Sequence, residues 1–101
     1  MGNNKLLSEL SETQCFQEKR CRDLLTQLKS CDFSDDYAST IDQYDALIEE
    51  ARKKLGTAAT EEKRIAALRT LNYRLANTAQ YYEGLMFQHG YSTTNAASEG
   101  S

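Results

Sequence analysis

The chain contains no proline in 101 residues, and no other feature of the sequence limits its possible folds as strongly. Proline breaks helices and is common in the turns that all-β domains require every few residues. Only five glycines are present to mark such turns, which disfavours a sandwich or a barrel. The length allows one domain and is too short for the large α/β enzyme folds. The sequence therefore predicts a small all-α domain.

Apolar side chains recur at helical spacing in three segments, at about 5–30, 35–55 and 60–89. The clearest period is that of the second segment, with Tyr37, Ile41, Tyr44, Ile48, Ala51 and Leu55 on one face. The short connections place successive helices antiparallel. We expect residues 1–90 to form a single helical domain, either an antiparallel three-helix bundle or a long helical hairpin with a shorter helix beside it. Residues 91–101 are predicted to be a flexible, disordered polar tail, because they contain too little apolar surface to offset their ordering entropy.

The ends of these segments contain residues that are typical of helix caps. Asp32 or Ser34 is placed to cap the second helix, and Thr60 is placed to cap the third. Gly56 follows a basic run and can adopt the left-handed conformation of a residue just past a helix end. Gly90 is predicted to end the third helix.

The apolar stripe of the first segment is interrupted by Thr13, Gln14 and Gln17, at positions where leucine would be expected. Polar residues in such a seam either fix the register of the helices, at some cost in stability, or line a wet groove. The sequence alone leaves both alternatives open.

Charge, hydropathy and cysteine content exclude several classes of function. The formal net charge of −3 argues against nucleic-acid binding, which draws its affinity from clustered lysine and arginine. No apolar run is long enough to cross a bilayer and no signal-peptide core is present, so we expect no membrane insertion and a cytoplasmic location. The cysteines, Cys15, Cys21 and Cys31, are odd in number and lack zinc-ligand spacing, so we interpret them as free thiols.

The sequence contains no recognisable catalytic motif. Its one histidine, His89, lies at the end of the third segment and is interpreted as a packing residue. Carboxylate pairs such as Asp42 and Asp45 fall on the outward face of an amphipathic helix, where water solvates them. No nucleophile elbow, phosphate-binding loop or zinc-binding histidine pair is present. We therefore expect no enzyme activity, no cofactor and no metal.

Residues 75–91 stand out because Glu83 is the only residue among them with a formal charge. A helix through this stretch presents apolar side chains on more than one face, and those that point away from the main stripe are Tyr73, Tyr81 and Phe87. Two small helices do not cover every side of a third, so we expect part of this surface to bind a partner. Burial in extra core or by self-association is the alternative. Gly84 either allows another helix to approach or is a tolerated surface glycine.

Leu24-Leu25-x-x-Leu28 is followed by the turn Cys31-Asp32-Phe33 and then by a helix with the pair Leu47-Ile48 and the basic residue Arg52. This pattern resembles the flagellar export chaperones of the FliT and FlgN type. Leu68-x-x-Leu71-Asn72-x-x-Leu75 is similar to the asparagine-bearing last long helix of the FlgN type. The resemblance covers about residues 15–80.

The resemblance implies a cytosolic chaperone that binds the helical end of a secreted filament or junction subunit. It would keep that subunit soluble and unpolymerised and deliver it to the export machinery. A released helical segment exposes an apolar stripe, which a groove with apolar walls can cover. We place such a groove along the third segment, with Leu71, Leu75, Tyr82, Leu85, Met86 and Phe87 as anchors.

The partners implied by this function are a helical segment of a protein substrate and components of the export apparatus, and a homodimer is compatible with it. The alternative function is that of a self-associating helical scaffold or assembly factor that binds no cargo. The two differ in what covers the uncharged part of the third segment, which is a foreign helix in one and a further copy of the chain in the other.

Overall fold

The computed structural model describes residues 2–91, which form three α-helices and one 3-10 helix. The α-helices are α1 (Gly2–Lys29), α2 (Ala38–Gly56) and α3 (Glu61–Gln88), and the 3-10 helix η1 (Asp32–Tyr37) connects α1 to α2. This part of the chain contains no strand, so the predicted all-α class is confirmed. Of the predicted tail, residues 92–101 lie outside the described residues.

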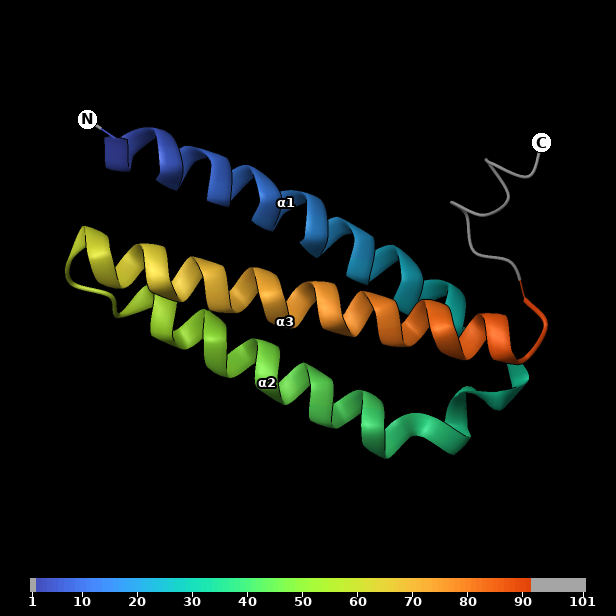
Figure 1. Cartoon of the computed structure of the whole chain (residues 1–101). Helices are drawn as coiled ribbons and strands as arrows, with labels where there is room; N and C mark the ends of the chain where they lie inside the picture. Colours follow the sequence, from blue (N-terminus) through green and yellow to red (C-terminus); the bar gives the residue numbers. More distant parts are fainter. Residues whose placement is uncertain (1, 92–101) are drawn as a thin grey trace, which may run out of the picture.

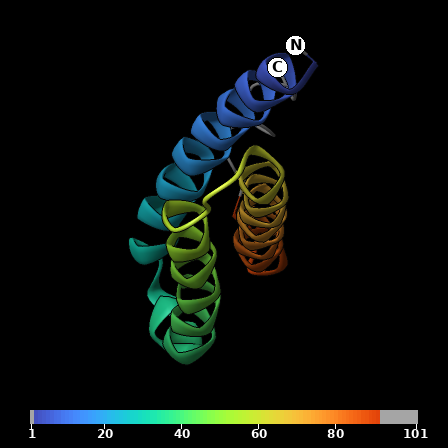
Figure 2. The same ribbon diagram turned by 90° about the vertical axis from the view of Figure 1, so that its left-hand side faces the viewer.

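Helix α3 is the centre of the bundle, because α1 and α2 both pack against it (Figures 1 and 2). The chain runs in one direction along α1, returns along α2 and follows the first direction again in α3 (Figure 1). Over their described residues, the backbones of α1 and α2 do not contact each other. The antiparallel three-helix bundle is therefore confirmed, with α1 packed on α3 rather than on the helix that follows it in sequence.

The core extends along α3 and takes side chains from every element. Its buried apolar residues are Cys21, Leu24, Leu28, Cys31, Phe33, Ile41, Ile48, Ala51, Leu68, Leu71, Leu75, Ala79, Tyr82, Leu85 and Met86. The Cys21 thiol donates a hydrogen bond to the backbone oxygen of Leu75 over 3.0 Å. Burial raises the pKa of Cys21 to about 11, so this thiol stays neutral and acts as a packing group. All three cysteines are free.

The connection between α1 and α2 differs from the prediction. Asp32 and Ser34 do not cap α2, because they lie within η1, and α2 follows Tyr37, whose side chain makes no capping hydrogen bond. The cause is Phe33, which is buried and stacks on the His89 ring with the two centroids 3.9 Å apart. Winding the segment as a 3-10 helix turns this ring into the bundle while keeping the backbone hydrogen-bonded.

Two of the other three predicted helix ends are confirmed. The Thr60 side chain accepts a hydrogen bond from the Lys63 backbone N–H over 3.1 Å, as an N-cap residue does. Gly90 ends α3 with a φ of 85°, and the N–H of Tyr91 reaches back to the Met86 oxygen over 2.8 Å. Gly56 was expected to be left-handed but is the last residue of α2, since the N–H of Thr57 bonds directly to the Lys53 oxygen and needs no left-handed residue.

Candidate protein-binding surfaces

The structure separates the predicted anchor residues into a buried group and one exposed residue. Of the six predicted anchors, Phe87 is 81% exposed. The other five are exposed by 5% or less, and they are Leu71, Leu75, Tyr82, Leu85 and Met86. These five do not form an open apolar stripe, because α3 is the central helix and turns that stripe towards α1 and α2. The side of α3 that stays exposed includes Tyr73, at 61%, together with Phe87.

A groove opens between α1 and α2, and α3 provides its floor. Its floor contains Leu75 and Tyr82, which are two of the predicted anchors, together with Thr78. The walls are formed by Glu18, Cys21, Arg22 and Leu25 from α1 and by Asp45, Ile48 and Arg52 from α2. The volume of the groove is about 190 Å³, which is room for one large side chain. Its floor is mostly apolar and its rim is charged.

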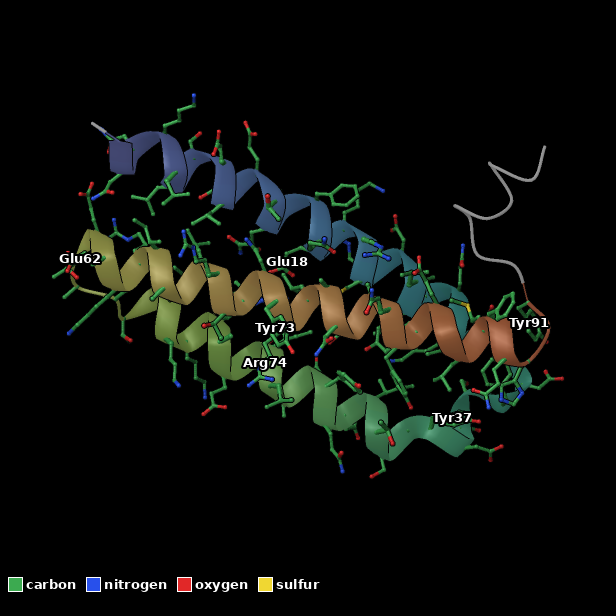
Figure 3. The ribbon with its side chains drawn as sticks, in the orientation of Figure 1. Glu18, Tyr37, Glu62, Tyr73, Arg74 and Tyr91 are labelled. Carbon is green, nitrogen blue, oxygen red and sulfur yellow. The ribbon has the colours of Figure 1, made fainter. Side chains whose placement is uncertain are left out.

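An ion pair between Glu18 and Arg52 joins α1 to α2 across the rim of this groove. The Arg52 Nε donates to one Glu18 oxygen over 3.1 Å, and a guanidinium Nη2–H donates to the other oxygen. This two-point contact lowers the pKa of Glu18 and raises that of Arg52, because each charge stabilises the other. Figure 3 shows Glu18 projecting from α1 towards the other helices. The pair links α1 directly to α2 along this groove.

The polar positions of the α1 seam take part in these contacts. Gln14 is half-buried and donates to Glu18 over 3.4 Å, and Gln17 accepts from Arg20 over 3.4 Å. Arg20 in turn pairs with Glu83 of α3 at 2.8 Å. Gln14 and Gln17 thus bond within α1 and hold Glu18 and Arg20, which are the residues that contact α2 and α3, so their part in the register of α1 is indirect. Thr13 is exposed and bonds only to the backbone of its own helix.

We expect the Glu18–Arg52 pair to contribute modestly to stability. Glu18→Gln should lower the free energy of unfolding by about 0.5–1 kcal/mol at pH 7, since both side chains are partly exposed to water. The folded-state pKa of Glu18 is lowered, so its contribution is present above the ordinary pKa and lost as pH falls through the lowered value. Urea unfolding at pH 7 and pH 3 should show this difference shrinking. Glu50→Gln, on the exposed side of α2, is the control, and an equal effect in both variants would contradict the assignment.

A second surface, which we call the outer face, follows α3 on the side away from the core. It consists of six exposed residues at alternating spacings of three and four, namely Thr70, Tyr73, Asn77, Gln80, Gly84 and Phe87. None has a charged side chain. This is the spacing of the a and d positions of a coiled coil. Tyr73, labelled in Figure 3, is part of this face.

The outer face continues into a groove of about 390 Å³ between the end of α2 and the start of α3. We call it the alanine groove, and its lining is Ala51, Lys54, Thr57, Ala58, Lys63, Ala66, Ala67 and Thr70. The walls are small side chains, and the two charged residues, Lys54 and Lys63, are both basic. The groove therefore has the shape and charge to accept a bulky side chain that comes with acidic neighbours.

A cluster of aromatic rings closes the opposite end of the bundle. His89 stacks on Phe33, and the Tyr37 hydroxyl lies 3.0 Å from the His89 Nε2. Tyr91 lies beside Phe33, with the ring centroids 5.6 Å apart, and Figure 3 shows Tyr37 and Tyr91 at this end. These contacts confirm the packing role predicted for His89, although the residue is exposed and not partly buried as the sequence suggested. Tyr91 belongs to this cluster, so the described structure extends one residue into the predicted tail.

A comparison with protein-family models, curated proteins and solved structures found no match for this chain. Function must therefore be inferred from the surfaces themselves. Within residues 2–91, no helix is apolar over a stretch long enough to cross a membrane, and no cluster of three or more His, Cys, Asp or Glu side chains is placed to hold a metal ion. The grooves and the outer face are the features suited to binding another protein.

Sequence reasoning missed Glu18 and Arg52 as members of a site. Arg52 was interpreted as a basic residue near a helix end, and nothing local indicated that it reaches Glu18, 34 positions away. The feature of the sequence that could have indicated this site is the run of polar residues in the α1 seam, because it marks the part of α1 that is not packed by apolar contacts alone. For the outer face, the signal in the sequence is the lack of charged side chains along that stripe of α3.

Proposed function

We propose that this protein is an export chaperone of the flagellar or type III kind that acts in the cytoplasm. It binds the helical end of a secreted subunit, keeps that subunit soluble and unpolymerised, and delivers it to the export apparatus. The observation that supports this function is the groove between α1 and α2, whose floor contains Leu75 and Tyr82. In this proposal the protein has no enzyme activity or cofactor and binds neither nucleic acid nor membrane.

The arrangement of the three helices favours a helix as the bound segment. Because α1 and α2 flank α3 without backbone contact between them, a fourth helix laid over the groove would complete a four-helix bundle. One large apolar side chain of that helix would enter the groove and pack against the half-buried Leu25, above Tyr82. The charged rim, with Arg22 and Asp45 on opposite walls, would then pair with polar residues beside the inserted side chain.

The test is binding of labelled peptides from the helical ends of flagellar filament and junction subunits, followed by fluorescence anisotropy. We expect at least one peptide to bind with a dissociation constant of about 1 μM or less. Leu25→Arg places a charge in the wall of the groove and should weaken that binding by about tenfold or more. Asp45→Arg reverses an exposed rim charge and should weaken it without disturbing the core.

Ala46→Arg introduces the same charge at an exposed position of α2 outside the groove, and it should bind the peptide as the wild type does. Circular dichroism of each variant checks that the helices are retained. Equal binding by all three variants would show that the groove is not the site. If none of the peptides binds the wild-type protein, the chaperone proposal is wrong and the self-associating scaffold takes its place.

A further inference from the structure

The outer face of α3 has a pattern that an ordinary solvent-facing surface does not need. Its six residues, which helical geometry places on one stripe, are all uncharged over five successive steps of three or four positions. Solvent-exposed helix faces are usually rich in charged residues, whereas an uncharged stripe suits the seam between two packed helices. Phe87, 81% exposed, is a large apolar side chain left uncovered in this seam.

We propose that the outer face binds a second copy of this chain, with the two α3 helices antiparallel and related by a two-fold axis between Asn77 and Gln80. The inference is independent of the cargo groove, which lies between α1 and α2. A two-fold axis requires the surface to be complementary to itself, so each residue must fit the one that it meets in the other copy. The residues of the outer face meet this requirement.

The pairs that this axis creates match large side chains with small ones. Tyr73 faces Gly84 of the second copy, where a Cβ would meet nothing within 4 Å and the surface is therefore open. Asn77 faces Gln80, and two side-chain amides can exchange hydrogen bonds. Phe87 faces Thr70. No pair places two large side chains against each other.

The alanine groove receives the aromatic end of the second copy. Phe87 faces Thr70, which lines the groove of about 390 Å³ together with Ala66, one step further along α3. Phe87 is 81% exposed, so it has apolar surface to bury there. Phe87 and the alanine groove thus lie at matching distances on either side of the proposed axis.

Charge favours the same orientation. The two basic residues of the alanine groove, Lys54 and Lys63, would come near η1 of the second copy, where Asp32 and Asp35 are exposed. A parallel arrangement would instead place Lys63 beside Lys63 and leave the groove without an aromatic side chain. Opposite charges at a rim set the orientation of an interface more than its affinity.

Sedimentation equilibrium of the full chain tests the dimer. We expect a monomer–dimer equilibrium, and Gly84→Trp should raise the dimer dissociation constant at least tenfold by filling the place of Tyr73. The monomer tolerates this change because the space around Gly84 is open. Ala46→Trp, at an exposed position of α2, should leave the equilibrium unchanged. A wild-type monomer at all concentrations, or a dimer indifferent to Gly84→Trp, would overturn the proposal.

Cross-linking tests the orientation in a Cys15→Ser background. Tyr73 faces Gly84 across the proposed axis, so a mixed dimer of the Tyr73→Cys and Gly84→Cys proteins has one pair of facing cysteines and keeps one Tyr73–Gly84 pair. A mixture of the Tyr73→Cys and Gly84→Cys proteins should form a mixed disulfide dimer under mild oxidation, whereas neither protein alone should, because its two cysteines would lie far apart along the paired helices. Absence of the mixed product would rule out this orientation. The Gly84→Trp protein should still bind the peptides that test the cargo groove, so either proposal can fail without the other.

Discussion

Tyr82→Ala is expected to lower the free energy of unfolding by about 3–5 kcal/mol, the range found when a large aromatic ring is removed from a core. Tyr82 is 3% exposed and belongs to the same buried cluster as Ile48, Leu75 and Leu85. No neighbouring side chain is free to fill the space without leaving its own contacts. Urea unfolding followed by circular dichroism measures the loss. A domain of this size has little stability to spare, so we expect partial unfolding at 37 °C.

Tyr73→Ala is the matched control, because it removes the same ring from a position of α3 that is 61% exposed. We expect it to change the free energy of unfolding by about 0.5 kcal/mol or less at protein concentrations that keep the chain monomeric. Similar losses in the two variants would contradict the burial that separates the two tyrosines.

The burial of Tyr82 can also be measured through the ionisation of its hydroxyl group. Burial raises its pKa to about 12 from the ordinary value of 10. The folded state therefore holds this proton more tightly, and the stabilisation is complete below pH 10 and lost as pH rises through 12. In an alkaline absorbance titration of the folded protein, Tyr82 should ionise only near pH 12.

The helix ends that were predicted correctly are those at which a single residue provides the capping group or the turn. Thr60 supplies its own hydroxyl oxygen to the first turn of α3, and Gly90 supplies its own positive φ, so neighbours in sequence were sufficient. The prediction for Asp32 was wrong because a distant contact decided that region, whereas Gly56 stays helical through the local hydrogen bond from Thr57 to Lys53. Burying Phe33 against His89 required the 3-10 helix η1 where a cap had been expected.

The arrangement of the helices depends on contacts that periodicity does not reveal. An apolar stripe shows that Leu71 and Leu75 are turned inward, but it does not say which helix covers them. Short connections suggested that successive helices would be the neighbours, yet α1 packs on α3. The ion pair from Arg52 to Glu18 links residues 34 positions apart, and neither residue alone indicates the other.

The candidate site was predicted in part. Leu75 and Tyr82 were identified as anchors and do line a groove, although at its floor and almost fully covered. Phe87 was placed with them, but the structure puts it on the outer face. Helix α3 thus has apolar side chains both in the core and on the outer face, which explains why residues 75–91 are apolar in more than one direction. In the proposals made above, cargo uses one side and a second copy uses the other.

Leu75→Ala is expected to lower the free energy of unfolding by about 3 kcal/mol, within the range of 2–5 kcal/mol for leucine removed from a core. The Leu75 side chain is fully buried, at 0% exposure, directly beneath the groove between α1 and α2. Its backbone oxygen would keep the hydrogen bond from Cys21, because the substitution leaves the main chain intact. The lost methyl groups would open a cavity that joins the groove floor.

Leu47→Ala is the control for this prediction, since it deletes the same atoms from a side of α2 that is 38% exposed. We expect a loss of about 1 kcal/mol or less in the same urea experiment. Because the cavity in the Leu75→Ala protein lies under the groove, the folded variant should also accept a larger apolar side chain there. A peptide whose inserted leucine is replaced by phenylalanine should gain affinity for Leu75→Ala relative to the wild type, and an unchanged preference would show that no peptide side chain reaches the groove floor.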